Sequence, residues 1–375
     1  MLLKPFLLDL WLAEHEPSTE YNLAASTGPV WTLDQLLQLG SEEDRQRFLH
    51  HPLSYGRPAG DDHLRAAIAE MQGVSPDSVQ VVTGASEALL ILMWLAAEPG
   101  GNVILPHPGF TTFSALPESL GLETRFYRLH RENSFRVDVE EIKKRADART
   151  KLILVNNPHN PTGATISDEE WDDLHGFASD CGIQLVSDEV YHPVFHGRET
   201  RSAARLPHAT VIHDFSKAYP LPGLRLGWMI ERDPERRERY LSARSYFTVS
   251  NTSGGELLAT IAMRNRDVIL RRTREAARRN LQLLERFMME HSDVLGWVRP
   301  AGGLTAFPWL LSGENARPLC QALVERGVLL APGDCFEMPA YFRLGFGATE
   351  DRFPQGLGRF AEFLRIWARK TAIAG

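Results

Sequence analysis

The chain has 375 residues, of which 43% are apolar and 24% charged, ordinary values for a globular protein with room for a large and a smaller domain. A formal net charge of −7 argues against a general nucleic-acid-binding protein, because neutralising phosphates requires a basic surface. No apolar run approaches the roughly 20 residues that a membrane-spanning helix needs, so we expect no membrane span.

The cysteines are few and scattered, at Cys181, Cys320 and Cys335. Their odd number and wide spacing provide neither a disulfide framework nor the spacing of metal ligands. We therefore expect no metal site, and we expect a cytoplasmic protein because free thiols are typical of a reducing compartment.

The first predicted element is the apolar run of residues 1–12. Asp9 interrupts this run, Pro5 breaks it early, and no small-residue cleavage site follows it. We expect an arm that packs on the body of the protein or on a partner subunit, rather than a secretion signal.

Candidate strands alternate with helical stretches between about residues 77 and 231. The strands are 79–83, 102–106, 124–129, 152–156, 183–187, 210–214 and 224–230. Continuous apolar strands separated by helices predict an α/β domain, in which a mostly parallel seven-stranded sheet is covered by helices on both faces. Ligands bind such sheets at the carboxyl ends of the strands.

Long helices are predicted next, at residues 233–246 and 253–291. The second is rich in arginine, but interleaved acidic residues favour a solvated helix face over a nucleic-acid surface. Short strands and helices return from residue 297, so the two chain ends are expected to form a smaller α+β domain. We place an N-terminal arm and part of the small domain at residues 1–45, the large domain at 46–275 and the C-terminal small domain at 276–375.

Two charged residues stand at predicted strand ends. Lys217 follows one in Asp214-Phe215-Ser216-Lys217, and its amine could condense with an aldehyde such as pyridoxal phosphate, although a lysine there is more often a surface charge. Asp188 follows another, where a buried carboxylate could keep a pyridine nitrogen protonated. Its alternative role is to cap the next helix.

Two turns also follow strands. Asn156-Asn157-Pro158-His159-Asn160-Pro161-Thr162-Gly163 predicts a tight, irregular loop that can hold an amide against a ligand. Thr83-Gly84-Ala85-Ser86 opens an apolar helix and exposes backbone N–H groups suited to a phosphate. It matches neither the Walker loop nor the Gly-x-Gly-x-x-Gly dinucleotide pattern.

In the same order along the chain, these motifs resemble those of the class I/II aminotransferases, which are fold-type I pyridoxal-phosphate enzymes. The resemblance runs from about Tyr55 to Arg343. It implies a pyridoxal 5′-phosphate cofactor bound by the domain at 46–275. It also implies amino acid and 2-keto acid substrates, and a homodimer with shared active sites.

The resemblance implies a role for each matching residue. Lys217 would carry the cofactor and move a proton to and from the substrate. Asp188 would pair with the pyridine nitrogen, while Tyr191 and Asn160 would bind the phenolic oxygen of the ring. Phe110, in Pro108-Gly109-Phe110, would stack on the ring face.

The remaining implied roles concern anionic groups. Arg343, in Phe342-Arg343-Leu344-Gly345, would bind the substrate α-carboxylate. Tyr55 would reach the phosphate of the neighbouring subunit. The phosphate cup would be formed by Gly84, Ala85, Ser86, Ser216 and Arg225.

A second resemblance, to capreomycidine synthase-like enzymes, rests on residues 21–28, 31–33 and 157–165. It implies elimination and cyclisation of a modified amino acid such as hydroxyarginine. Tyr191, which we expect to vary in that group, favours an ordinary aminotransferase. A β-lyase or decarboxylase of the same fold is a more distant alternative. No arginine is placed by a motif to demand a dicarboxylate substrate.

Overall fold

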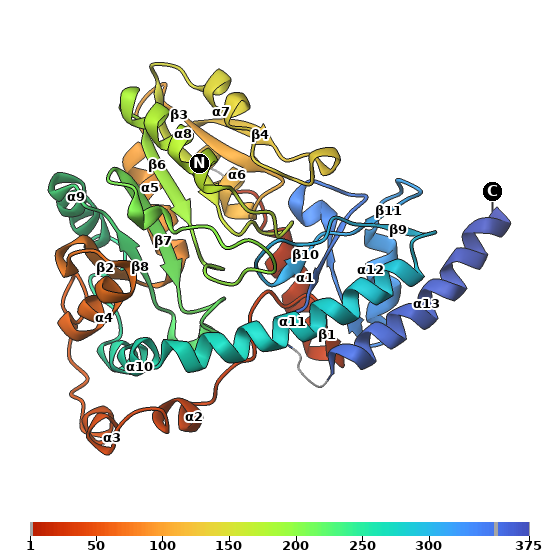
Figure 1. Cartoon of the computed structure of the whole chain (residues 1–375), viewed down its shortest axis with the longest axis horizontal. Helices are drawn as coiled ribbons and strands as arrows, with labels where there is room; N and C mark the ends of the chain where they lie inside the picture. The colour runs from red at the N-terminus through yellow and green to blue at the C-terminus, as the bar shows by residue number, and fades with distance from the viewer. Residues whose placement is uncertain (1–2, 349–351, 375) are drawn as a thin grey trace.

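The computed structural model of the protein describes residues 3–348 and 352–374, and its centre is a sheet of seven strands (Figure 1). The strands lie in the order β2 (Val79–Val82), β8 (Gly227–Ile230), β7 (Ala209–Asp214), β6 (Gln184–Asp188), β5 (Thr150–Asn156), β3 (Asn102–His107) and β4 (Glu123–Arg128). Only β8 runs antiparallel to its neighbours in this sheet. The predicted seven-stranded, mostly parallel sheet is confirmed.

Helices cover the sheet because its strands are apolar on both faces. Strands β3, β7 and β8 are buried at every residue, whereas the edge strand β4 is largely accessible. Helix α5 (Gly84–Ala96) contacts β7 and β8, α6 (Thr111–Ser119) contacts β3 and β4, and α8 (Asp168–Asp180) contacts β6. In Figure 1, α8 lies in front of the sheet and α5 behind it.

Shorter helices surround this core. Helix α8 begins with a capping box between Ser167 and Glu170, and α4 (Asp62–Gln72) ends at Gly73, whose φ of 65° suits glycine. The others are α1 (Leu7–His15), α2 (Leu33–Leu37), α3 (Glu42–Leu49), α7 (Val139–Arg145) and α9 (Pro234–Arg244). No helix in the described ranges is long and apolar enough to cross a membrane.

The helix predicted at residues 253–291 is wrong in one respect, because the structure divides it into α10 (Ser253–Arg264) and α11 (Arg266–Glu290). Asn265 separates them with φ −108° and ψ 23°, and its side-chain amide donates to the Ile261 carbonyl at 2.9 Å. Asparagine competes in this way for backbone groups and so ends helices. The apolar periodicity continues through the break, which is why the sequence does not reveal it.

A smaller part is built from both chain ends. Strand β1 (Tyr21–Asn22) pairs with β12 (Val328–Leu329), and β10 (Thr305–Ala306) and β13 (Ala331–Pro332) flank β14 (Phe342–Gly345). The pair β9 (Leu295–Gly296) and β11 (Trp309–Leu310), α12 (Arg317–Val324) and α13 (Phe353–Ala374) complete it. This arrangement confirms the predicted small α+β part.

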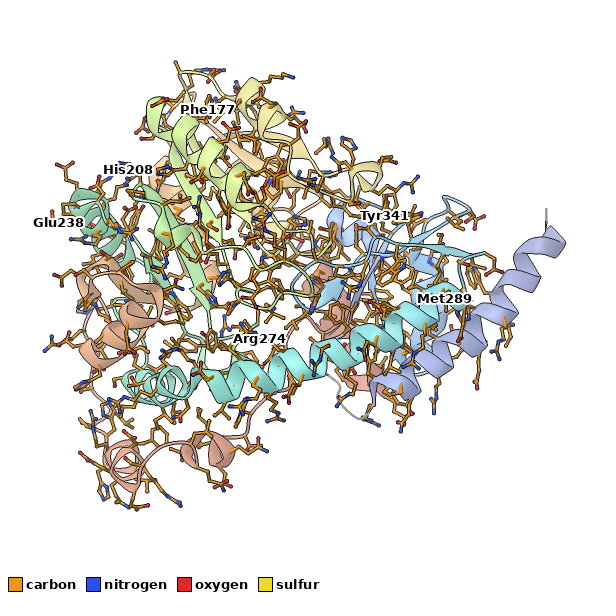
Figure 2. The ribbon with its side chains drawn as sticks, in the orientation of Figure 1. Phe177, His208, Glu238, Arg274, Met289 and Tyr341 are labelled. Carbon is orange, nitrogen blue, oxygen red and sulfur yellow. The ribbon has the colours of Figure 1, made fainter. Side chains whose placement is uncertain are left out.

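Helix α11 connects the two parts and packs against α13 (Figure 1). Near its beginning, Arg274 donates to the Pro193 carbonyl at 2.8 Å, while Met289 lies exposed near its other end (Figure 2). The predicted boundary at residue 275 therefore falls within a continuous helix. The domain limits of 1–45, 46–275 and 276–375 stay a prediction.

His213 on β7 is a buried polar residue of the core. Its ring stacks on Trp228 with centroids 4.3 Å apart, its Nε2 lies 2.7 Å from the His192 carbonyl, and its Nδ1 accepts from the Asp214 N–H at 2.8 Å. Burial lowers the pKa of His213 from 6.5 to about 3. The folded protein therefore holds this ring neutral.

His213 should make the fold sensitive to acid. Because the unfolded chain binds the proton more tightly, this histidine costs no stability above pH 6.5 and about 1.4 kcal/mol per pH unit as the pH falls towards 3. Replacing His213→Gln should reduce the loss of unfolding free energy between pH 7 and pH 5 by about 2 kcal/mol in urea titrations. The exposed His50→Gln is the control, and equal losses in wild type and His213→Gln would contradict this account.

Candidate functional site

A cavity of about 240 Å³ lies at the carboxyl ends of the central strands. Every predicted site residue lines it except Gly84 and Tyr55. Its lining from these residues is Ala85, Ser86, Phe110, Asn160, Asp188, Tyr191, Ser216, Lys217, Arg225 and Arg343. The structure thus brings together side chains from strand ends that are up to about 260 residues apart in sequence.

Lys217 lies just beyond β7, with its amine in the cavity. Its Nζ donates to the Ser26 hydroxyl at 3.0 Å. Burial lowers the pKa of the lysine, Arg343 and Arg225 lower it further, and the Asp214 carboxylate opposes them. A lowered pKa increases the neutral fraction of the amine, which is the nucleophilic form.

Asp188 is the last residue of β6 and is buried. One carboxylate oxygen accepts from the Val190 N–H at 3.2 Å. Burial raises the pKa of Asp188 to about 7, and the neighbouring acids Asp214 and Glu189 add to this shift. A nearby cation is needed to hold such a carboxyl fully ionised at neutral pH, and a protonated pyridine would supply one.

The asparagine loop after β5 is fixed by its own amides. Asn156 Oδ1 accepts from the Asn160 N–H at 2.7 Å, and Asn156 Nδ2 donates to the Asp188 carbonyl at 3.0 Å. Asn160 Oδ1 in turn accepts from Arg343 Nη1 at 3.2 Å. These bonds join the loop, the end of β6 and strand β14 into one wall.

Among the described residues that line the cavity, two buried side-chain polar atoms lack hydrogen-bond partners. They are the hydroxyl of Tyr191 and Nε of Arg343, and the two residues are 1% and 2% exposed. The other nitrogens of Arg343 donate to Asn160 and to the Ala24 carbonyl at 2.9 Å. A buried polar group left unpaired is costly, so both atoms point to a polar ligand.

The opposite end of the cavity suits a phosphate. Helix α5 begins there, and its N-cap Thr83 makes no capping bond with its side chain, so Ala85 and Ser86 offer N–H groups. Arg225 Nη1 lies 3.5 Å from the Ser216 hydroxyl. Gly84 has φ +74°, and a Cβ there would lie 3.1 Å from Arg225 Nη2, so a side chain would intrude on this cradle.

Arg225 itself corrects a predicted element. The strand expected at 224–230 begins only at Gly227, and Pro222–Leu224 forms a 3-10 turn (η5). Arg225 follows with φ 52°, a left-handed conformation that is uncommon for a residue with a side chain. This turn directs the Arg225 guanidinium into the cavity. In an extended strand, alternate side chains would instead have been buried against the sheet.

Residues that the motifs did not assign also line the cavity. Asp214 is buried beside Lys217 and accepts from the Ser216 N–H at 2.8 Å, and Asn156 orders the loop. Both residues stand at strand ends inside the quoted motifs, and this position was the sequence signal that could have identified them. Ser26 and the α1 residues Leu8, Asp9 and Leu12 come from remote segments. For α1, the only signal was an acidic residue interrupting an apolar run.

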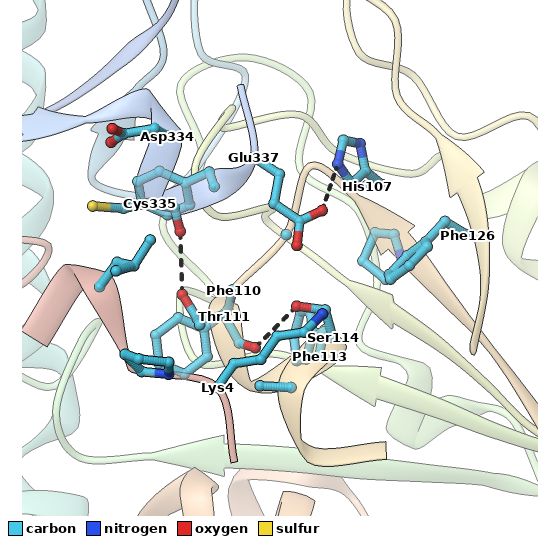
Figure 3. Close-up of a pocket in the computed structure, with 16 residues that line it drawn as sticks. Lys4, His107, Phe110, Thr111, Phe113, Ser114, Phe126, Asp334, Cys335 and Glu337 are labelled. Carbon is cyan, nitrogen blue, oxygen red and sulfur yellow. Dashed lines mark hydrogen bonds and ion pairs between the residues drawn. The ribbon is translucent and has the colours of Figure 1, made fainter. Parts of the chain in front are cut away.

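Phe110 lines both this site and a second cavity of about 240 Å³, which is the one drawn in Figure 3. Its neighbours Phe6 and Phe113 contact it edge-on, with centroids 5.4 and 6.2 Å away. In Figure 3 the Thr111 hydroxyl donates to the Cys335 carbonyl at 3.2 Å, which ties α6 to the 3-10 turn η6 (Gly333–Phe336). Phe110 is thus held firmly as one wall of the site.

Tyr55 lies outside the cavity and is 88% exposed. Its role at the phosphate of a neighbouring subunit stays a prediction. Within the described ranges, no group of three or more His, Cys, Asp or Glu side chains could hold a metal ion.

Comparison with known proteins gives a consistent picture. The family model of class I and II aminotransferases matches residues 29–360. Capreomycidine synthase of Streptomyces vinaceus is 28% identical, covering 96% of this chain and 94% of that protein. Aspartate/prephenate aminotransferase of Thermus thermophilus is 28% identical, covering 86% of each. A pyridoxal-phosphate-dependent aminotransferase from Streptococcus suis superposes with a TM-score of 0.91 at 29% identity, covering 97% and 98% of the two chains.

Two glycines of the small part leave room for the N-terminal segment to pack against Lys217. Thr27 Oγ1 donates to the Ser216 carbonyl at 2.8 Å, and the Gly28 N–H donates to the Lys217 carbonyl at 3.3 Å. A Cβ at Gly345 would collide with the Ala25 carbonyl, and one at Gly347 would lie 2.5 Å from the Thr27 carbonyl. The absence of side chains on these glycines therefore lets the segment approach the lysine.

Replacing Gly345→Ala should push residues 25–27 away and withdraw Ser26 from Lys217. We expect a loss of about 1–3 kcal/mol of unfolding free energy, as for an overpacked core, measured by urea titration. Gly358→Ala in α13 is the matched control: beyond the backbone of its own helix, an added Cβ would meet no atom within 4 Å, so the substitution should be neutral or slightly stabilising. Equal stability of the two variants would rule out the close packing described.

Proposed function

The chain belongs to the class I and II aminotransferases and is a pyridoxal-phosphate-dependent transferase, and on this premise we propose that it moves the amino group of an L-amino acid to a 2-keto acid. The observation that carries the proposal is one cavity lined by a lysine amine of lowered pKa, a buried carboxyl and two arginines. Reaction at an amino acid α-carbon needs these groups together: an amine, a partner for a pyridine nitrogen, and two anion sites.

The residues present fit the cofactor. When bound, pyridoxal phosphate supplies an aldehyde that condenses with amines and a protonated ring that accepts the electron pair released at the α-carbon. Its phosphate would be held by the start of α5, Ser216 and Arg225. Asp188 would bind the pyridine nitrogen, and the unpaired Tyr191 hydroxyl and Asn160 would bind the phenolic oxygen.

Lys217 would act in two ways. In the resting enzyme its Nζ would hold the cofactor, and when free its Nζ would be placed to take the α-proton of the substrate. The lowered pKa leaves Nζ able to accept this proton and to return it to a different carbon. Ser26, 3.0 Å from Nζ, orients the amine between these tasks.

Arg343 would orient the substrate by binding its α-carboxylate. Its guanidinium is fixed by Asn160 and the Ala24 carbonyl and lies over the Phe336 ring at 5.3 Å, so little conformational freedom remains to be lost on binding. A fixed carboxylate determines which α-bond faces the amine of Lys217. Such positioning selects the reaction by orientation rather than by added chemistry.

A homodimer completes this proposal. The segment that carries Tyr55 is attached to the start of α10, where the Ser253 hydroxyl donates to the Ser54 carbonyl at 3.1 Å. Leu53 and Tyr55 on this segment are 100% and 88% exposed. Large exposed apolar surface is typical of an interface between subunits, and Tyr55 on it would reach the partner's phosphate.

A second candidate is elimination or cyclisation on the same cofactor. The match to capreomycidine synthase over 96% of the chain favours it, and the cavity residues described serve either reaction. A β-lyase or decarboxylase would use them too. Transamination differs from all of these reactions, because it leaves the amino group of the first substrate on the enzyme.

Turnover without an acceptor distinguishes these candidates. An aminotransferase given an L-amino acid and no keto acid should release about one 2-keto acid per active site and then stop, because the amino group remains on the cofactor. Adding 2-oxoglutarate or pyruvate should restart turnover. Product is measured by mass spectrometry across a panel of amino acids. Continuous release of many equivalents without an acceptor would instead establish elimination, cyclisation or decarboxylation.

Mixed dimers test the role of Tyr55. Lys217→Ala should be inactive, and Tyr55→Ala should lose roughly ten-fold in activity with the loss of a bond to a charged group. Random 1:1 dimers of the two variants contain one native site in half of the molecules, so about one quarter of wild-type activity should return. Activity no greater than the average of the two variants would show that Tyr55 serves no partner site.

A further inference from the structure

Only a few charged side chains line the cavity. The inference drawn from them rests on the proposed function. That function uses Lys217, Asp188, Arg225 and Arg343. The Asp214 carboxylate accepts the Ser216 N–H and faces Lys217 and Arg225. Of the charged residues that line the cavity, Asp9 is the one to which that function gives no role; within its own helix it is the acidic residue of the first turn of α1.

Asp9 reaches the cavity from α1, which is firmly seated. Leu8 and Trp11 are buried, and Trp11 Nε1 donates to the Leu330 carbonyl at 2.8 Å. At the start of this segment the Phe6 ring contacts Phe110, with centroids 5.4 Å apart. The helix therefore fixes Asp9 at the wall beside the proposed cofactor face.

The Asp9 carboxylate makes no hydrogen bond or ion pair with any residue that the structure describes. It nevertheless acts on both groups that would flank the reacting carbon. Its negative charge raises the pKa of Lys217 and that of Arg343, against the larger lowering that burial causes at each. Asp9 thus lies within Coulomb range of both cations.

This position bears on the substrate side chain. The α-carbon must lie between Lys217, which takes its proton, and Arg343, which binds its carboxylate. Asp9 lines the same cavity as these two residues, and its charge acts on both, so a substrate side chain held there meets the field of this carboxylate. A carboxylate there attracts a cationic side chain and repels a second carboxylate.

We propose that Asp9 is a specificity-determining residue that selects an amino acid with a positively charged side chain, a guanidinium or an ammonium. The carboxylate binds the distal charge of the substrate while Arg343 binds its α-carboxylate. Acidic donors are disfavoured at the same wall. Because Asp9 is solvent-accessible, the pairing is screened, and a moderate preference is expected rather than an absolute one.

Arginine and citrulline provide a matched test, because they share size and shape but only arginine is charged. Binding to the holoenzyme is followed by the change in cofactor absorbance, and keto acid release is measured separately. Asp9→Asn should weaken L-arginine binding and lower its kcat/KM by roughly five- to ten-fold, while L-citrulline changes by less than two-fold. Glu14→Gln, which removes another α1 carboxylate away from the cavity, should leave both unchanged.

Other outcomes would overturn the inference. Equal losses of binding and kcat/KM for arginine and citrulline in Asp9→Asn would assign Asp9 a structural role. Equal gains for all amino acids would mean that Asp9 competes with the substrate carboxylate for Arg343. Wild-type enzyme that binds citrulline as well as arginine would also reject it. If arginine binding depends on Asp9 but no keto acid forms, the inference stands and the proposed transamination fails.

Discussion

The site depends on a lysine amine and two carboxyls that are withdrawn from water at one edge of a sheet. Strands β6 and β7 are parallel neighbours in which Asp188 pairs with Ile212, so Asp188 and the Asp214–Lys217 turn emerge at the same level. Burial raises the pKa of both acids and lowers that of the lysine, and the attraction between the lysine and the carboxylates offsets part of this cost. A cofactor that brings a pyridinium and an aldehyde would use Asp188 and Lys217.

The small part of the protein contributes one wall of this site. Segment 24–28 crosses Lys217 and Arg343, and it can do so because Gly345 and Gly347 leave room for its backbone. Helix α1 adds the wall that carries Asp9. Chain ends far apart in sequence therefore determine what reaches the lysine, whereas the central strands determine what the lysine can do there.

Much of this was predictable because it is local. Apolar runs and turn residues predicted the seven strands, and the family resemblance carried by the motifs at their ends implied most of the residues that line the cavity. Contacts between distant segments were not predictable: nothing in Ser26 or Asp9 indicates that either lies beside Lys217. The break at Asn265 and the left-handed turn at Arg225 were also hidden, since each depends on a single residue within a continuing apolar pattern.

The central claim is that Lys217 carries the cofactor. Borohydride reduction of the purified holoenzyme fixes the cofactor to the amine that holds it, and peptide mass spectrometry then identifies that amine. The account predicts a pyridoxyl group on the peptide containing Lys217 and on no other lysine. A modification on Lys4 or Lys151, or unmodified Lys217 in protein that retains the cofactor, would contradict it.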